Sequence, residues 1–309
     1  MNTPPQSTPD NKLYAASWGL VAYTILIIAW GAWVRISGSG DGCGDHWPLC
    51  KGEAVPIGES VKTWIEVSHR YSTALFGLLV LGQIYAVWRL TLANNSARWW
   101  VWMTLVFTIT EALIGRQLVK LGLVNESEHF SRLVVMPLHL INTSLLLISE
   151  VMTAEGIKFG MRVRQPLSVT SRRWSVIIGS VLLLLLTSGA IAALGAHLFP
   201  SVTLLDGLID DFSENAHPAL RLRVLHPLLA LILPLVIWSV LSQSHRRAST
   251  PELARMYREF AVAVLIMIVV GIATLVFLSP VWLKFAHLTI ANLLVVLAAR
   301  CLFHTLRPT

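Results

Sequence analysis

Eight long apolar runs, separated by short polar segments, dominate the chain. A helix needs about 20 mostly apolar residues to cross a bilayer. The pattern predicts eight such helices, at residues 15–36, 64–89, 98–117, 131–152, 174–196, 220–242, 259–279 and 281–304. Ser279-Pro280 divides the last two, because proline cannot continue the helical hydrogen bonding. The predicted fold class is therefore an all-α integral membrane protein.

The composition agrees with a membrane protein. Of 309 residues, 55% are hydrophobic and 13% are charged, and the mean hydropathy is +0.65. A soluble domain has about 25% charged residues. The net charge of +7 does not indicate nucleic-acid binding, because the basic residues lie in short loops between apolar runs. The polar, Pro-rich start lacks the basic region of a signal peptide, and we expect a short disordered tail there.

Lysine and arginine are concentrated after the even-numbered helices. They are Arg89, Arg98, Lys158, Arg162, Arg164, Arg172, Arg173, Arg246, Arg247, Arg255 and Arg258. Segment 197–219, after the fifth helix, has none of these but carries Asp206, Asp210, Asp211 and Glu214. The positive-inside rule predicts cytoplasmic termini and an extracytoplasmic loop after each odd-numbered helix. We interpret the acidic segment as a solvated loop.

The first outer loop, GSGDGCGDHWPLC (residues 38–50), contains two of the three cysteines. Thiols oxidise on that side of the membrane, and Cys43 and Cys50 are close enough to pair. The pattern predicts a disulfide that holds Trp47 and Pro48 over the site below. A redox relay and a metal site with His46 are the alternative roles. Cys301 has no partner at its membrane depth and is expected to be a small buried hydrophobe.

Four of the ten histidines lie inside predicted helices. His69, His139, His226 and His287 lie on the second, fourth, sixth and eighth, and at 1.5 Å per residue their heights agree within about 6 Å. A hydrogen bond to a neighbouring helix would explain the presence of any single histidine inside a membrane helix. Four in one layer favour two imidazole pairs, each holding a planar metal macrocycle from both sides. The other six (His46, His129, His197, His217, His245 and His304) are expected to be mostly solvated.

The histidine spacing also divides the chain. His69 and His226 are 157 residues apart, and His139 and His287 are 148 apart. This predicts two pseudo-symmetric four-helix bundles, residues 1–157 and 158–309, related by rotation about the membrane normal.

Three other polar residues lie near the histidine layer. Glu66 is one turn from His69 on the same helix face. It is either a site residue or a carboxylate favoured by the helix dipole. Arg70 is a candidate partner for a haem propionate. Glu111 is expected to pair with Arg116 or Arg35, or to face the cavity of the first half.

With these motifs in place, the chain resembles the haem A synthase family over nearly its whole length. The motifs are Val34-Arg35-Ile36-Ser37-Gly38-Ser39-Gly40 running into Cys43, Asp45-His46-Trp47-Pro48-Leu49-Cys50, Glu66-x2-His69-Arg70, Gly115, Lys120-Leu121-Gly122-Leu123, His139, His226-Pro227 and His287-Leu288. The cysteine pair is typical of one bacterial branch, whose members can carry a second pair after the fifth helix. This chain has no cysteine there, and Glu111 stands where the resemblance leads us to expect glutamine.

The resemblance implies a function and a set of roles. The family oxidises the C8 methyl group of haem O to a formyl group through a hydroxymethyl intermediate, which supplies haem A to terminal oxidases. By this resemblance His226 and His287 hold haem b, His69 and His139 flank the substrate haem O, and Glu66 is the essential carboxylate. The implied location is the bacterial plasma membrane. The implied partners are haem O synthase and an electron donor that the sequence does not identify; the oligomeric state, including a homo-oligomer, stays open.

Three other functions compete with this interpretation. A quinol-oxidising cytochrome with two permanent haem b groups would use the same histidines, but would leave Glu66 and the cysteine loop without a role. A prenyltransferase making haem O should carry paired Asp-rich motifs on the cytoplasmic side, which the sequence lacks. A non-catalytic assembly factor would only hold haem.

Overall fold

The structure, a computed structural model, describes residues 10–160, 169–246, 248 and 250–306. Within these ranges the chain forms helices and no strand, apart from an isolated bridge between Cys50 and Glu53. The long helices are α1 (Asn11–Ile36), α2 (Val61–Leu90), α3 (Ala97–Lys120), α4 (Arg132–Phe159), α5 (Val169–Leu198), α8 (Leu225–Arg246), α9 (Pro251–Val276) and α10 (Val281–Leu306). Two short helices, α6 (Leu204–Asp211) and α7 (Pro218–Arg223), lie between α5 and α8. The all-α prediction is confirmed, whereas the expectations for residues 1–9, Arg162, Arg164 and Arg247 concern positions outside the described residues.

Seven helical segments of the described chain are long and apolar enough to cross a membrane. They are α1, α2, α4, α5, α9, α10 and the segment Pro218–Arg246, which consists of α7, Val224 and α8. The prediction of a multi-pass membrane protein is therefore supported. Helix α3, which covers the predicted third span, is not among the seven; its sequence contains Arg98, Glu111, Arg116 and Lys120.

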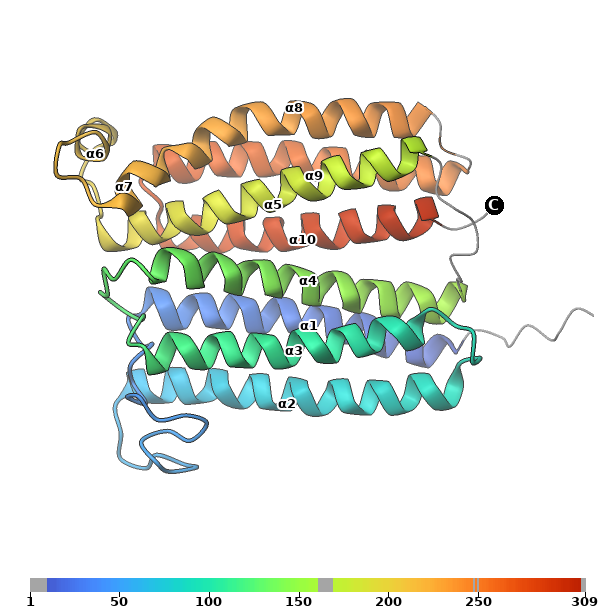
Figure 1. Cartoon of the computed structure of the whole chain (residues 1–309), viewed down its shortest axis with the longest axis horizontal. Helices are drawn as coiled ribbons and strands as arrows, with labels where there is room; N and C mark the ends of the chain where they lie inside the picture. Colours follow the sequence, from blue (N-terminus) through green and yellow to red (C-terminus); the bar gives the residue numbers. More distant parts are fainter. Residues whose placement is uncertain (1–9, 161–168, 247, 249, 307–309) are drawn as a thin grey trace, which may run out of the picture.

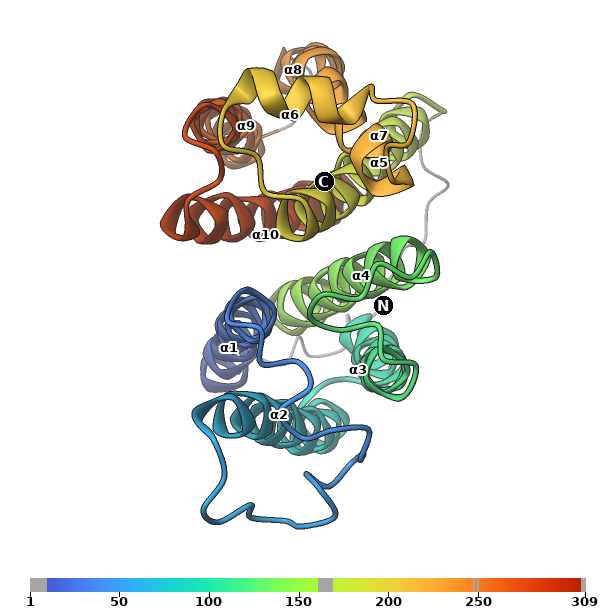
Figure 2. The ribbon, with the colours of Figure 1, turned by 90° about the vertical axis from the view of Figure 1, so that its left-hand side faces the viewer.

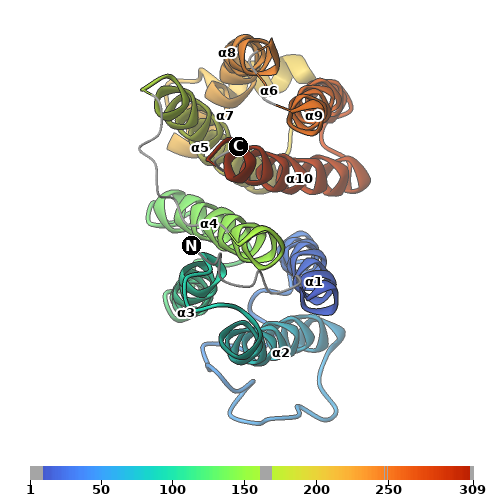
Figure 3. The same ribbon diagram turned by 90° about the vertical axis from the view of Figure 1, so that its right-hand side faces the viewer.

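The long helices lie side by side in two groups (Figure 1). Helices α1 to α4 form one group, and α5, α8, α9 and α10 form the other (Figures 2 and 3). Helices α1, α4, α5 and α10 line the boundary between the groups. The start of α1 and the end of α10 lie at one end of the molecule, which we call the terminal end; the disulfide loop, α6 and α7 lie at the opposite, loop end (Figure 1).

Apolar side chains pack within each group and also between the groups. Phe260 and Val264 of α9 pack with Ile237 and Leu241 of α8 in the second group. The middle of the boundary, where α1 and α4 meet α10, is apolar. One cluster of buried side chains lies there: Val21, Leu147, Val151, Val295, Val296 and Ala299. Because lipid tails are as apolar as these side chains, close packing rather than water exclusion holds such helices together.

The predicted helix at 220–242 is broken just before its histidine. Helix α7 ends at Arg223 and α8 begins at Leu225. Pro227 has no N–H to donate to the carbonyl of Arg223, four residues earlier, so the helical hydrogen bonding is interrupted there. The break places His226 in the first turn of α8. The turn at Ser279-Pro280 is present as predicted, with positive φ angles of 55° at Leu278 and 58° at Ser279.

Candidate functional site

His226 and His287 face each other inside the second helix group. Their ring centroids are 6.1 Å apart and their planes are at 85°. An imidazole nitrogen binds a transition metal at about 2 Å, with the ring centre about 1 Å farther away, so two rings on opposite sides of one ion are centred about 6 Å apart. The pair therefore has the spacing that one haem iron with two axial histidines requires.

The Nδ1 atoms of the four histidines differ in their partners. The Ser188 hydroxyl of α5 lies 3.1 Å from His226 Nδ1 and can fix its orientation. In the described part of the chain, Nδ1 of His69, His139 and His287 is buried without a hydrogen-bond partner. Since buried polar atoms are normally satisfied, these nitrogens are compatible with a layer that is completed by a bound group.

Three of the four imidazoles pack against a glycine of the neighbouring helix. A Cβ atom on Gly31 of α1 would lie 3.1 Å from His69 Cε1, and one on Gly189 of α5 would lie 3.1 Å from His226 Cε1. A Cβ on Gly271 of α9 would lie 3.4 Å from His287 Cε1. The sequence analysis missed these glycines, although they occur on odd-numbered predicted helices at the height of the histidines. Their role is to leave room for the rings.

The fourth histidine, His139, has a carboxylate nearby. Glu111 Oε1 of α3 lies 3.2 Å from His139 Nδ1, although not in hydrogen-bonding geometry. Thr143 Oγ1 donates to the same oxygen, and Asn142 Nδ2 donates to Oε2 at 2.6 Å. Of the alternatives expected for Glu111, pairing with Arg116 or Arg35 is wrong. His69 is close enough to His139 for electrostatic interaction.

Glu66 connects the histidine layer to the cysteine loop. Its buried carboxylate accepts a hydrogen bond from the Cys43 main-chain N–H at 2.8 Å and pairs with Arg70 Nη2 at 2.5 Å. Arg70 Nη1 donates to the carbonyls of His46 at 2.7 Å and Leu49 at 3.0 Å. The sequence made Arg70 a candidate partner for a haem propionate, which stays a prediction; in the structure its guanidinium holds the loop. These contacts attach residues 43–50 to the first three turns of α2.

Cys43 and Cys50 form a disulfide, and both are buried. The Thr63 hydroxyl of α2 donates to the Gly42 carbonyl at 2.9 Å. The loop main chain approaches α2 so closely that a Cβ on Gly42 would lie 2.7 Å from the Lys62 carbonyl oxygen. The loop is therefore packed on the start of α2. Cys301 is free and buried, as predicted.

Three of the groups expected to be mostly solvated are not: His304, Asp211 and the Nε2 atom of His197, which is buried. His304 lies between helices, where its Nε2 is 3.0 Å from Oε2 of the fully buried Glu155 of α4, and Arg300 Nε is 3.2 Å from Oε1. In the acidic segment, residues 204–211 form α6, and Asp211 is buried against Arg223 at 2.6 Å. Burial raises the pKa of Asp211, and the charge of Arg223 lowers it by less.

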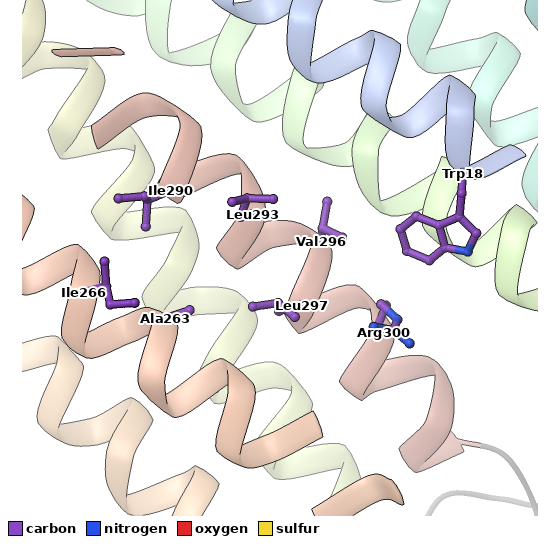
Figure 4. A pocket seen from close by; sticks show the side chains of 8 residues that line it. All are labelled: Trp18, Ala263, Ile266, Ile290, Leu293, Val296, Leu297 and Arg300. Atoms are coloured by element: carbon purple, nitrogen blue, oxygen red, sulfur yellow. The ribbon is translucent and has the colours of Figure 1, made fainter. Parts of the chain in front are cut away.

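An apolar pocket of about 240 Å³ runs along α10 toward the terminal end (Figure 4). Side chains of α1, α9 and α10 line it: Trp18, Ala263, Ile266, Ile290, Leu293, Val296, Leu297 and Arg300. None of the four layer histidines lines it, so the pocket is separate from the histidine layer.

These features define a class of protein: a multi-pass helical membrane protein whose second helix group contains an imidazole pair spaced to hold haem. The profile of the COX15-CtaA family, described as "Cytochrome oxidase assembly protein", matches residues 15–299. The chain belongs to this family, the haem A synthase family, and the resemblance seen in the sequence is confirmed.

The chain is similar to proteins that carry two different functional names. A "Protoheme IX farnesyltransferase" of Thermus thermophilus is 35% identical over 295 residues, covering 94% of this chain but 47% of that protein. A "Heme A synthase" of Bacillus cereus is 36% identical over 98 residues, 32% of each chain. The chain thus spans about half the length of the Thermus relative, and more than half of that protein lies outside the match.

Proposed function

We propose that the protein is a haem A synthase that oxidises the C8 methyl group of haem O to a formyl group through a hydroxymethyl intermediate. The observation that carries the proposal is the facing pair His226 and His287, with centroids 6.1 Å apart, in a chain of this family. Haem O has a farnesyl tail that confines it to the bilayer, so an enzyme embedded in the membrane suits it. An unactivated methyl group has no acidic proton, so a bound haem must supply the redox chemistry and the protein must supply orientation and electrostatics.

The proposal assigns different roles to residues 1–157 and 158–309, as two pseudo-symmetric four-helix bundles with α3 as the eighth span. His226 and His287 would hold a resident haem b, oriented by Ser188. His69 and His139 would flank haem O, with Gly31 leaving room for one ring and Glu111 lying beside the other. The orphaned Nδ1 atoms of His69 and His139 support a ligand in the first half as well.

Glu66 is the proposed catalytic carboxylate of the first half. Oxidation of a methyl group and loss of water from a gem-diol both move protons, and a carboxylate beside the substrate can accept and return them. Both Glu66 oxygens have partners in the structure, Cys43 N–H and Arg70. Any proton transfer by Glu66 is therefore coupled to the position of the disulfide loop.

The orientation in the membrane follows from charge. Arg89, Arg98, Arg246 and Arg258 lie toward the terminal end, which we assign to the cytoplasm by the positive-inside rule. The loop end, with the disulfide, then faces outward. The proposed location is a bacterial plasma membrane, and the proposed partners are haem O synthase, which makes the substrate, and an electron donor.

The name of the Thermus relative favours a second candidate, farnesyl transfer to haem. Paired Asp-rich motifs expected for that chemistry are absent from the sequence. The nearest acidic group, Asp206, Asp210 and Asp211, lies on α6 at the loop end, and Asp211 is engaged by Arg223. Since more than half of the Thermus protein lies outside the match, farnesyl transfer fits its other part better.

The test is analysis of the haems in membranes. Bacterial cells that lack their own haem A synthase but make haem O would express the chain, and extracted haems would be separated by chromatography. Appearance of haem A at the expense of haem O supports the proposal. Haem O made from haem b in cells lacking haem O synthase indicates farnesyl transfer. Unchanged haems with two haem b per chain indicate an electron-transfer cytochrome, and unchanged haems with a single bound haem indicate an assembly factor.

A further inference from the structure

Four basic side chains meet where the two helix groups touch at the loop end. Arg35 lies in the last turn of α1 and Arg132 is the first residue of α4. His197 lies in the last turn of α5, and Lys284 lies in the first turn of α10. These are the four helices that line the boundary (Figure 2), so each group contributes two of the basic side chains.

Contacts of neighbouring residues join these helix ends in two pairs, α1 with α10 and α4 with α5. Trp33 of α1 packs on Phe285 of α10, with ring centroids 6.3 Å apart. Leu133 of α4 and Leu194 of α5 lie in one buried cluster. Arg35 is close enough to Arg132, His197 and Lys284 to act on all three electrostatically. The four residues therefore form one basic cluster.

The basic cluster has no anionic partner in the described part of the chain. None of its four members takes part in an ion pair there, and the side chains of Arg35 and Lys284 make no hydrogen bond. Arg132, only 2% exposed, donates from Nη1 to the carbonyls of Asn125 and Ser127, but its Nε has no partner.

Neither His197 nor the nearby Glu126 balances the charge of the basic cluster with an ion pair. His197 Nε2 is also buried and unpartnered among the described residues. Glu126 acts on Arg132 and His197, but it makes no ion pair within that range. Three permanent positive charges therefore repel one another where solvent is scarce, a costly arrangement without a counter-ion.

We propose that Arg35, Arg132, His197 and Lys284 form an oxyanion-binding site shared by the two helix groups. Guanidinium and ammonium groups bind carboxylate and phosphate oxygens with charge-assisted hydrogen bonds. The ligand is the carboxylate or phosphate of an amphipathic molecule whose apolar body lies among the helices.

Two sources can present this chemistry at the observed depth. Lys284 is three residues toward the loop end from His287, and Arg35 is four residues beyond Gly31, which packs on His69. Arg132 is seven residues before His139, and His197 is eight residues beyond Gly189, which packs on His226. The cluster therefore extends from about 5 Å to about 12 Å, one to two or more helical turns, outside the histidine layer. The first source is the pair of carboxylates at the edge of a macrocycle held in the histidine layer, which reach the basic cluster. This source rests on the proposed function. The phosphate of a phospholipid in the same leaflet is the other source.

Two affinities separate these sources: that of protohaem and that of its dimethyl ester. Both are measured on the purified full chain in nanodiscs of phosphatidylcholine and phosphatidylglycerol. We expect wild type to bind protohaem about tenfold or more tightly than the ester, because the ester lacks both negative charges. Arg35→Gln and Lys284→Gln should abolish this ratio. Lys284→Arg should keep it, as should Lys120→Gln, which removes an exposed charge at the same end of the bundle.

The remaining outcomes are also decisive. An unchanged ratio with loss of bound phosphatidylglycerol in native mass spectrometry assigns the site to a lipid phosphate. In detergent without haem or anionic lipid, Lys284→Gln should raise Tm, because it relieves repulsion. A lower Tm with unchanged ratio and unchanged lipid binding would overturn the proposal. These affinities do not depend on haem A production, so the oxyanion site and the proposed function can fail separately.

Discussion

The main-chain N–H of Cys43 donates to Oε2 of Glu66 at 2.8 Å, so one cysteine of the disulfide is tied directly to the carboxylate next to the histidine layer. The loop and the carboxylate therefore form one unit.

Glu66→Gln tests the proposed catalytic role. The amide keeps the shape but cannot exchange protons as a carboxylate does, so haem A formation should fall by about 100-fold or more. Haem O or its hydroxymethyl form should accumulate, and haem b should be retained. Haem extraction and chromatography measure all three. Glu59→Gln, in the preceding loop, is the control, and normal haem A output from Glu66→Gln would reduce Glu66 to a carboxylate that anchors the loop.

Loss of the disulfide should destabilise the loop and, through it, Glu66. In the chain-entropy model a closed loop of this length contributes about 2–3 kcal/mol to the free energy of unfolding. The double variant Cys43→Ser/Cys50→Ser should therefore melt earlier and make less haem A. Mass spectrometry of denatured, unreduced, alkylated wild type should show label on Cys301 alone. Label on all three cysteines would contradict the disulfide.

Substitution of the histidines should separate the two halves. His226→Ala or His287→Ala should remove most haem b, because in the proposed function each would hold the resident haem. His69→Ala and His139→Ala should retain haem b and lose haem A formation. The haem b content per protein, from the absorption spectrum, is the measurement, with His46→Ala in the loop as control. Full haem b content in both second-half variants would show that the assignment is reversed or wrong.

The glycines that make room for the imidazoles predict a graded effect. Gly189→Ala places a Cβ 3.1 Å from His226 Cε1 and should weaken haem b binding by about tenfold, a typical result of overpacking. Gly271→Ala, at 3.4 Å from His287, should have a smaller effect. Gly179→Ala, which meets nothing within 4 Å, is the control on α5. Equal haem b affinity in all three variants would show that the rings tolerate closer packing.

Glu155 provides a test of how the two helix groups are joined. Glu155→Gln leaves Arg300 and His304 without their buried anion, and the free energy of unfolding should fall by about 3 kcal/mol. Glu259→Gln removes the partner of Arg255 in an exposed pair and should change stability by less than about 1 kcal/mol. Thermal unfolding in detergent compares the two. Similar Tm values would mean that the buried cluster contributes little to stability.

The sequence predicted the helices better than it predicted their contacts. Apolar runs of membrane-spanning length determine where a helix must form, because a lipid-exposed backbone has to satisfy its own hydrogen bonds. The constant rise per residue of these helices likewise predicted that the four histidines lie at one height. Helix α6 was missed because a short, acidic helix outside the membrane has no such constraint.

Contacts between distant residues could not be predicted from local pattern. His304 was expected in solvent, but its partner Glu155 is 149 residues away in the chain. The sequence showed Glu66 near His69, but it gave no sign that a loop N–H would bind it. Glu111 had several candidate partners at similar depth, and only the packing of α3 on α4 brings it to His139. The assignments of His69, His139, His226 and His287 to particular haems remain predictions.

The two glutamates of α4 find their partners at different times during synthesis. Glu150 accepts a hydrogen bond from Thr24 of α1, a helix already made when α4 enters the bilayer. Glu155 pairs with Arg300 and His304 of α10, which is made well after α4. An unpaired carboxylate is costly in a membrane, so α4 stays incompletely satisfied until α10 arrives. A chain truncated before α10 should therefore expose this defect to the quality control of the membrane, and Glu155 would act as an internal check that α10 has packed on α4.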